Sequence, residues 1–129
     1  MEREILFRGK ASNGRWVYGS LVVSKKIDPA IYFNISKGVA EVLDWCYVKP
    51  DTVGQYTGLK DKNGNKIFEG DVVIIGEKLK AKVIYYDGAF RMQSEFSPTP
   101  IDTTDMGYMM REFSVRVIGN IHDNPELIK

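Results

Sequence analysis

Three ionisable side chains have the residue types and the spacing of a hydrolytic site. Glu69 and Asp71 lie two residues apart, so on a continuous strand both carboxylates would project from one face, where they could bind a metal ion or exchange protons. His122 is the only histidine, and Asp123 follows it directly. However, Gly70 weakens the strand geometry, and neighbouring strand residues point to opposite faces, so Asp123 is badly placed to orient the imidazole. We therefore expect a turn in which Asp71 accepts backbone N–H groups, and a hydrolase is the weakest of three functional hypotheses.

Motifs for metals and cofactors are incomplete. Asp61, Asn63 and Asn65 match the first three ligand positions of a calcium loop, but Lys66 and Val72 stand where its glycine and its bidentate glutamate are required. With one cysteine and one histidine, the chain lacks the residues for a Cys/His zinc site, and a nucleophilic pair of Cys46 with the histidine has no supporting signature. Phosphate-loop and dinucleotide fingerprints are also missing. We therefore expect no catalytic residue, no metal and no cofactor.

A stripe of lysines is a candidate for binding nucleic acid. Lys78, Lys80 and Lys82 alternate with apolar residues, so on a strand they would share one face. Beside Tyr85 or Tyr86 they could bind nucleic acid, because lysines pair with phosphates and bases stack on aromatic rings. The chain has 18 Lys and Arg against 17 Asp and Glu, a net charge of only +1. We therefore favour an edge strand that lysines protect from pairing with another chain, and keep nucleic acid as the alternative partner.

Aromatic residues are numerous in the segments with two-residue periodicity. They make up 12% of the 129 residues. Because alternate positions of a strand fall on opposite faces, some of these rings must be exposed or must pack against another chain. We therefore expect a homo-oligomer or a complex with another protein, without catalysis. The candidates for this interface are Trp16, Tyr18, Trp45, Tyr47, Met109 and Met110.

The elements that would position these residues are mainly strands. Apolar and polar residues alternate along most of the chain, and Asn63–Gly64 and Asp87–Gly88 are dipeptides typical of tight hairpin turns. The fold class is therefore all-β, or α+β with little helix. The expected parts are an N-terminal antiparallel meander over 1–56, a hairpin connection over 57–65, a small SH3-like barrel unit over 66–123 and a terminal turn over 124–129.

Two segments fit more than one structure. Residues 36–44 could form a turn of helix or a short strand, because their apolar spacing fits both. Residues 101–113 could form a short helix capped by Thr103 or Thr104, or an irregular loop.

Composition indicates a protein of the cytoplasm. No apolar run exceeds four residues, whereas a membrane-spanning helix needs about 20. The first residues carry acids where a signal peptide carries bases, and a single cysteine excludes an internal disulfide. We therefore expect no membrane association.

Three blocks of the sequence resemble the YopX family of prophage-encoded proteins. The segments Gln55–Gly64 and Ile67–Val73 are similar to the hallmark block of that family, Arg3–Gly9 to its opening and Val117–Leu127 to its close. Residues 20–50 and 89–114 carry no signature of the family. The resemblance implies a small, largely β protein encoded by a phage or prophage and therefore located in the bacterial host. Together with the missing catalytic motifs and the many aromatic residues, this leads us to expect an accessory protein with phage or host proteins as partners. Because the family has no established activity, it supplies no catalytic residue.

Overall fold

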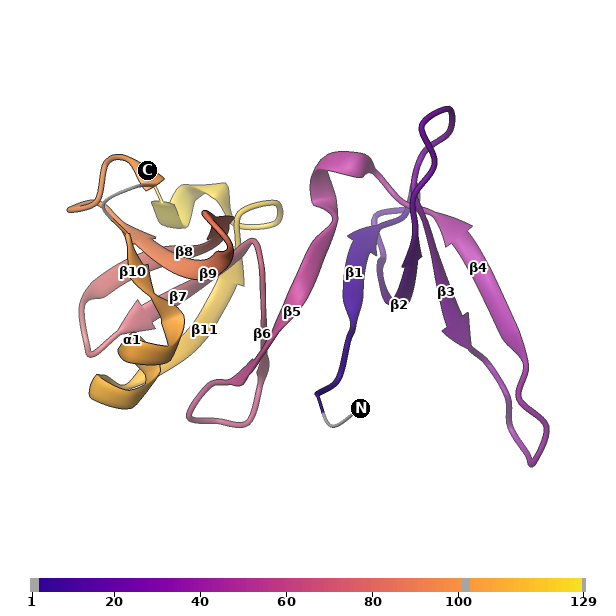
Figure 1. The fold of residues 1–129 in the computed structure, drawn as a ribbon, viewed down its shortest axis with the longest axis horizontal. Coiled ribbons are helices and arrows are strands. Elements are labelled where there is room, and N and C mark those ends of the chain that lie inside the picture. Colours follow the sequence, from indigo (N-terminus) through magenta and orange to yellow (C-terminus); the bar gives the residue numbers. More distant parts are fainter. Residues whose placement is uncertain (1–2, 101–102, 129) are drawn as a thin grey trace. The chain divides into compact units, whose positions relative to one another are not determined.

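The structure is a computed structural model that describes residues 3–100 and 103–128 (Figure 1). Residues 101–102 and 129 lie outside this description, so it leaves out the start of the segment 101–113 and the end of the terminal turn. Within the described residues the chain is mainly β, in two antiparallel sheets with one short α-helix, which confirms the fold class predicted from the sequence. The chain divides into two compact units, with the boundary after Tyr56.

Unit 1, which ends at Tyr56, is an antiparallel meander (Figure 1). Its strands follow the order β4-β3-β2-β1-β5. Residues 36–42 contain neither helix nor strand, because they form the loop of the long β3–β4 hairpin, in which the Ile35 N–H donates to the Val42 carbonyl (2.9 Å). The elements are β1 (Phe7–Lys10), β2 (Trp16–Val22), β3 (Ala30–Asn34), β4 (Leu43–Tyr47), the 3-10 helix η1 (Pro50–Thr52) and the first half of β5 (Gly54–Lys60).

The core of unit 1 is small. Ile31 is fully buried, and Val48 is 2% exposed. Val48 packs directly on the backbone of Gly9, where an added Cβ would lie 2.8 Å from the valine Cβ. This close approach requires glycine in β1, because no larger residue fits beneath Val48.

Unit 2 begins at Thr57 and contains a sheet of five strands in the order β10-β9-β8-β7-β11 (Figure 1). Strands β10 and β11 form its two edges, so the sheet is open over the described residues rather than a closed barrel of the expected SH3-like type. The elements are β6 (Lys66–Phe68), β7 (Asp71–Ile75), β8 (Leu79–Tyr86), β9 (Ala89–Ser94), β10 (Thr104–Asp105), α1 (Met106–Glu112), β11 (Val115–Asn120) and the 3-10 helix η3 (Pro125–Ile128).

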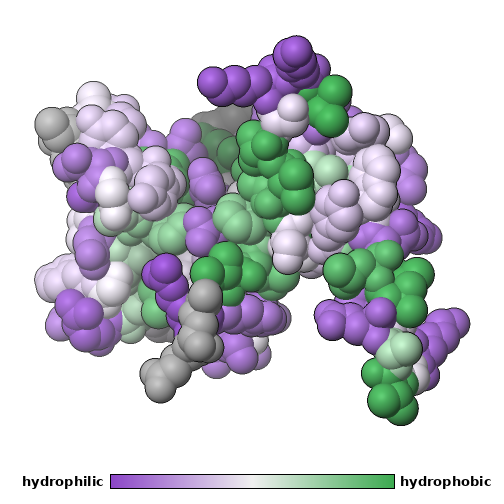
Figure 2. All heavy atoms as spheres, turned by 45° about the vertical axis from the view of Figure 1, so that its right-hand side comes forward, coloured by the Kyte–Doolittle hydropathy of each residue, from purple (hydrophilic) through white to green (hydrophobic). Residues whose placement is uncertain are grey.

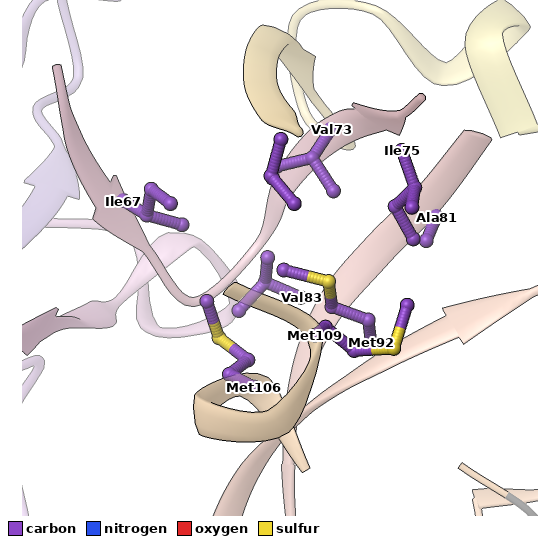
Figure 3. Packing of buried hydrophobic residues seen from close by; sticks show 9 residues of the cluster. Ile67, Val73, Ile75, Ala81, Val83, Met92, Met106 and Met109 are labelled. Carbon is purple, nitrogen blue, oxygen red and sulfur yellow. The ribbon is translucent and has the colours of Figure 1, made fainter. Parts of the chain in front are cut away.

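One face of this sheet forms the core of unit 2 (Figure 3). Val73 and Val83 are at most 1% exposed, and helix α1 contributes Met106 and Met109 to the same cluster. Met109 is 9% exposed and Met110 packs against the cluster, so these two residues belong to the core rather than to the interface expected from the sequence.

Helix α1 forms within the segment 101–113, for which the sequence allowed either a short helix or an irregular loop. Its N-cap is Asp105, whose Oδ1 accepts the Tyr108 N–H (3.0 Å). The expected caps have other roles, because Thr104 lies in β10 and the Thr103 hydroxyl donates to the Pro100 carbonyl. The helix is therefore capped by the carboxylate of Asp105, the residue directly before it, and not by a threonine hydroxyl one or two residues earlier.

The two predicted Gly-containing reversals differ in type. Asp87 and Gly88 both have positive φ, 53° and 78°, as a type I′ turn requires. At the other reversal only Gly64 has positive φ (84°), and the Asp61 N–H donates to the Asn65 carbonyl (2.8 Å). This is the geometry of a three-residue loop, in which a type I turn is followed by a glycine, and not of the type I′ turn that Asn-Gly favours.

Candidate interaction surfaces

Three aromatic rings form an exposed cluster on the β3–β4 hairpin of unit 1. Tyr32 pairs with Trp45 across the strands, and their ring centroids lie 6.0 Å apart at an interplanar angle of 25°. Trp45 also meets Tyr47 edge-on, at 5.1 Å and 84°, because residues two apart on a strand share a face. The three side chains are 36%, 45% and 49% exposed, respectively. We call Tyr32, Trp45 and Tyr47 the aromatic cluster.

A hollow of about 620 Å³ lies in unit 1 beside this cluster. Trp16, Tyr18 and Tyr47 are among the residues that line it. The Trp16 ring is flanked by cations, since the Arg8 Cζ lies 4.7 Å and the Lys10 Nζ 5.8 Å from its centroid. The four interface residues predicted for unit 1 therefore lie in this hollow or in the adjoining aromatic cluster. Sequence reasoning missed Tyr32, because only the strand register shows that it lies opposite a tryptophan.

The far end of the same hairpin exposes aliphatic side chains. Hydrophobic surface gathers at the projecting end of the hairpin, drawn in green in Figure 2. Exposed apolar side chains that gather in one region are typical of binding sites for other macromolecules. The exposed aliphatic residues are Ile35, Val39, Val42 and Leu43.

Strand β4 is also an unpaired edge of its sheet. The Val48 N–H donates to the Pro29 carbonyl (2.9 Å), so by the alternation of an antiparallel ladder the N–H and C=O groups of Leu43, Trp45 and Tyr47 point away from β3. One of these outward groups already has a partner, because the Trp45 N–H donates to the Asp44 Oδ1 (2.8 Å). A carboxylate at this place opposes the addition of another strand.

Cys46 lies on β4 and shows no sign of an activated nucleophile. Burial, and after it the nearby carboxylate of Asp44, raise the pKa of the Cys46 thiol. Since the thiolate is the reactive form, this environment makes the sulfur less reactive.

In unit 2, the three predicted lysines line one groove of about 420 Å³. Lys78 lies in the turn before β8, and Lys80 and Lys82 project from the strand on the face opposite Ala81, as the alternation predicted. The expected role of these lysines as guards of a sheet edge is wrong, because β8 lies between β7 and β9. We call this site the lysine groove. Its other lining residues are Ala81, Gln93, Ser94, Glu95, Ser97, Pro98, Leu127 and Ile128.

The two tyrosines proposed as stacking partners for these lysines do not line the groove. Tyr85 lies at an odd-numbered position of β8, so it projects from the face opposite Lys80 and Lys82, and it meets Phe90 edge-on at 5.1 Å. Tyr86 shares the face of the lysines but lies four residues beyond Lys82, at the end of the strand.

The backbone brings the three residues of the hydrolase hypothesis into one region of unit 2. The Ile121 N–H donates to the Gly70 carbonyl (2.9 Å), which places the turn containing Glu69 beside the segment of His122. Asp71 is 3% exposed, and its Oδ2 accepts the Phe68 N–H (2.8 Å), so its carboxylate holds the turn as expected. None of the three lines either hollow, and within residues 3–100 and 103–128 no group of His, Cys, Asp and Glu could hold a metal ion.

The Asp-x-Asn-x-Asn pattern of the 61–65 loop proves to be structural. Asp61 is 6% exposed, and its carboxylate accepts hydrogen bonds from the backbone N–H groups of Asn63 (2.9 Å), Asn65 (2.8 Å) and Val117 (2.9 Å). Burial raises the pKa of Asp61, but these backbone hydrogen bonds and one from the Asn65 side chain outweigh it, so the net shift is downward. Asp61 therefore fastens the loop to β11.

Comparisons with known proteins identify a family. The family model described as YopX protein matches residues 6–129. A search of curated proteins finds no match. Among solved structures, the chain is similar to the crystal structure of protein EF1440 from Enterococcus faecalis, with a TM-score of 0.62, 23% identity, and coverage of 99% of this chain and 100% of that one. Because the identity is only 23%, this similarity shows the fold alone.

None of the helices in the described part of the chain is long and apolar enough to cross a bilayer.

Proposed function

We propose that this chain, which belongs to the YopX family, acts without catalysis by binding other protein chains through unit 1. In this proposal it is a small prophage-encoded accessory protein of the bacterial cytoplasm. The contact surface consists of the aromatic cluster, the adjoining hollow and the aliphatic end of the β3–β4 hairpin.

The observation that carries the proposal is the exposure of three neighbouring aromatic rings. Tyr32, Trp45 and Tyr47 are each at least 36% exposed, although the Trp45 ring already contacts the other two. Covering such rings removes apolar surface from water at about 25 cal/mol per Å². Tyrosine and tryptophan are also enriched at the centres of protein interfaces.

The first partner that we propose is a second copy of this chain. Two copies of one aromatic surface can pack against each other around a two-fold axis, because stacked and edge-on ring contacts are self-complementary. With a net charge of +1, the two copies would repel each other only weakly. Phage or host proteins are the further partners.

Contact through the rings is favoured over the addition of a strand. Pairing of β4 with another strand would need the Trp45 N–H, which the Asp44 carboxylate already occupies. The ring faces, in contrast, are accessible without breaking a hydrogen bond of the hairpin. We therefore place the partner on the face of the hairpin and not at its edge.

The test is the molar mass of the purified chain by light scattering. The wild type is expected to exceed the mass of one chain, which is 14.7 kDa, and the Trp45→Ser/Tyr47→Ser variant is expected to have the mass of a monomer. Tyr85→Ser is the matched control, because Tyr85 is 55% exposed but lies in unit 2, and this variant should keep the wild-type mass. A strictly monomeric wild type that also retains no phage or host protein would refute the proposal.

A further inference from the structure

The lysine groove of unit 2 has no part in the proposal above, which concerns unit 1. Three lysines and one glutamate give its lining a net charge of +2. Gln93, Ser94 and Ser97 add amide and hydroxyl groups that can donate hydrogen bonds. Within the described residues, the ammonium groups of the three lysines have no hydrogen-bond or ion-pair partner. The groove therefore offers positive charge and donors to an anion.

The arrangement of the charges fits a chain of anions better than a single one. Lys80 and Lys82 are two residues apart on β8, so their Cα atoms are separated by about 6.6 Å along the strand. Lys78 continues the row from the turn before it. A single phosphate would reach only part of such a row, whereas a polyanion can contact every member of it.

The position of β8 disfavours an acidic peptide as this polyanion. An extended peptide needs partners for its own N–H and C=O groups, which it usually finds at a free sheet edge. Both edges of β8 are paired, with β7 and with β9. A nucleic-acid backbone needs no such edge, because its phosphate oxygens accept hydrogen bonds from side chains.

The apolar part of the groove favours a single strand over a duplex. Leu127 and Ile128 of η3 line the groove together with the lysines, and Ile128 is 40% exposed. Bases of a single strand can turn outward and lay their apolar faces on such a wall, whereas those of a duplex are stacked inside the helix. Tyr86 offers a ring on the same face of β8, beyond the groove.

From these observations we propose that the lysine groove binds the phosphate backbone of single-stranded nucleic acid. Three lysine contacts with phosphates release counterions, and the expected slope of log K against log salt is about −2 for a single strand. Between about 50 mM and 200 mM salt the affinity should therefore fall about 20-fold. The measurement is fluorescence anisotropy of a labelled oligothymidine of about 12 nucleotides with the full chain.

The test variant is Lys78→Gln/Lys80→Gln/Lys82→Gln. It keeps long polar side chains at positions that lie outside the core, so the thermal unfolding midpoint should stay that of the wild type. The variant should lose the salt-dependent binding, and Lys80→Gln alone should reduce the slope by about 0.7. A slope near zero in the wild type, or unchanged binding by the triple variant, would overturn the proposal.

The matched control removes the same charge elsewhere. Lys25→Gln/Lys26→Gln/Lys62→Gln changes three exposed lysines outside the groove and should keep the wild-type affinity. An equal loss in this control would show that overall charge, and not the groove, causes binding. Competition by polyglutamate as effective as by unlabelled oligothymidine would contradict a site for nucleic acid. Failure of any of these tests leaves the self-association of unit 1 untouched, because that is measured without nucleic acid.

Discussion

Replacement of Asp61 by alanine tests whether one buried carboxylate holds unit 2 together. Asp61→Ala removes the acceptor for the N–H groups of Asn63, Asn65 and Val117. In the variant, water can replace the carboxylate at the N–H groups of the two exposed asparagines. The N–H group of Val117 is harder for water to reach, because this residue is partly buried in β11; it lies 56 residues away in the sequence. A hydrogen bond to a charged group contributes about 1.5–3 kcal/mol, so with partial replacement by water we expect a loss of about 3 kcal/mol.

The assay is thermal unfolding of the full chain. For a unit of this size a loss of about 3 kcal/mol corresponds to a midpoint about 12–24 °C lower. Glu77→Ala is the control, because Glu77 is exposed in a turn of unit 2, and it should leave the midpoint unchanged. An unfolding midpoint of Asp61→Ala within about 2 °C of the wild type would refute our account of the loop.

The contribution of Asp61 to the stability of the fold should also depend on pH, and the direction of its pKa shift gives the sign. Because the pKa of Asp61 is lower in the folded chain than its ordinary value of about 3.9, its ionised form stabilises the fold. This contribution is fully present above the unfolded pKa and is lost as pH falls through the folded one. The difference in stability between wild type and Asp61→Ala should therefore be constant from about pH 7 to pH 5 and shrink below about pH 4. A difference that stays the same at pH 3 would contradict this assignment.

Two further substitutions test unit 1. Gly9→Ala places a methyl group 2.8 Å from Val48 and should destabilise the unit by about 1–3 kcal/mol in chemical denaturation, whereas Gly38→Ala, with nothing within 4 Å, should have no such effect; equal effects would exclude the packing explanation. Asp44→Ala frees the Trp45 N–H at the edge of β4 and should increase the average mass seen by light scattering at equal concentration, and an unchanged mass would show that Asp44 does not protect the edge.

The local features of the fold were predictable from the sequence because they depend on neighbouring residues. Alternation placed Lys80 and Lys82 on one face of a strand, and Asp87–Gly88 forms a tight turn because both residues tolerate positive φ. The mainly β class follows from the same patterns repeated along the chain.

Features that depend on distant residues were not predictable. The sequence around Lys80 does not reveal whether β8 is an edge or a central strand, because that depends on its pairing with both β7 and β9. The bond from Val117 to Asp61 joins a loop to a strand far along the chain, and its only local sign was an incomplete calcium-loop pattern. Met109 could be assigned to the core only once α1 was placed on the sheet.

The most direct test of protein contact through the β3–β4 hairpin is backbone hydrogen exchange at low and high protein concentration. We predict that exchange in residues 30–47 slows as the concentration rises, and that exchange in unit 2 does not change, because the aromatic cluster is covered by a second copy. Exchange that is independent of concentration throughout unit 1, or protection that appears only in unit 2, would contradict the account.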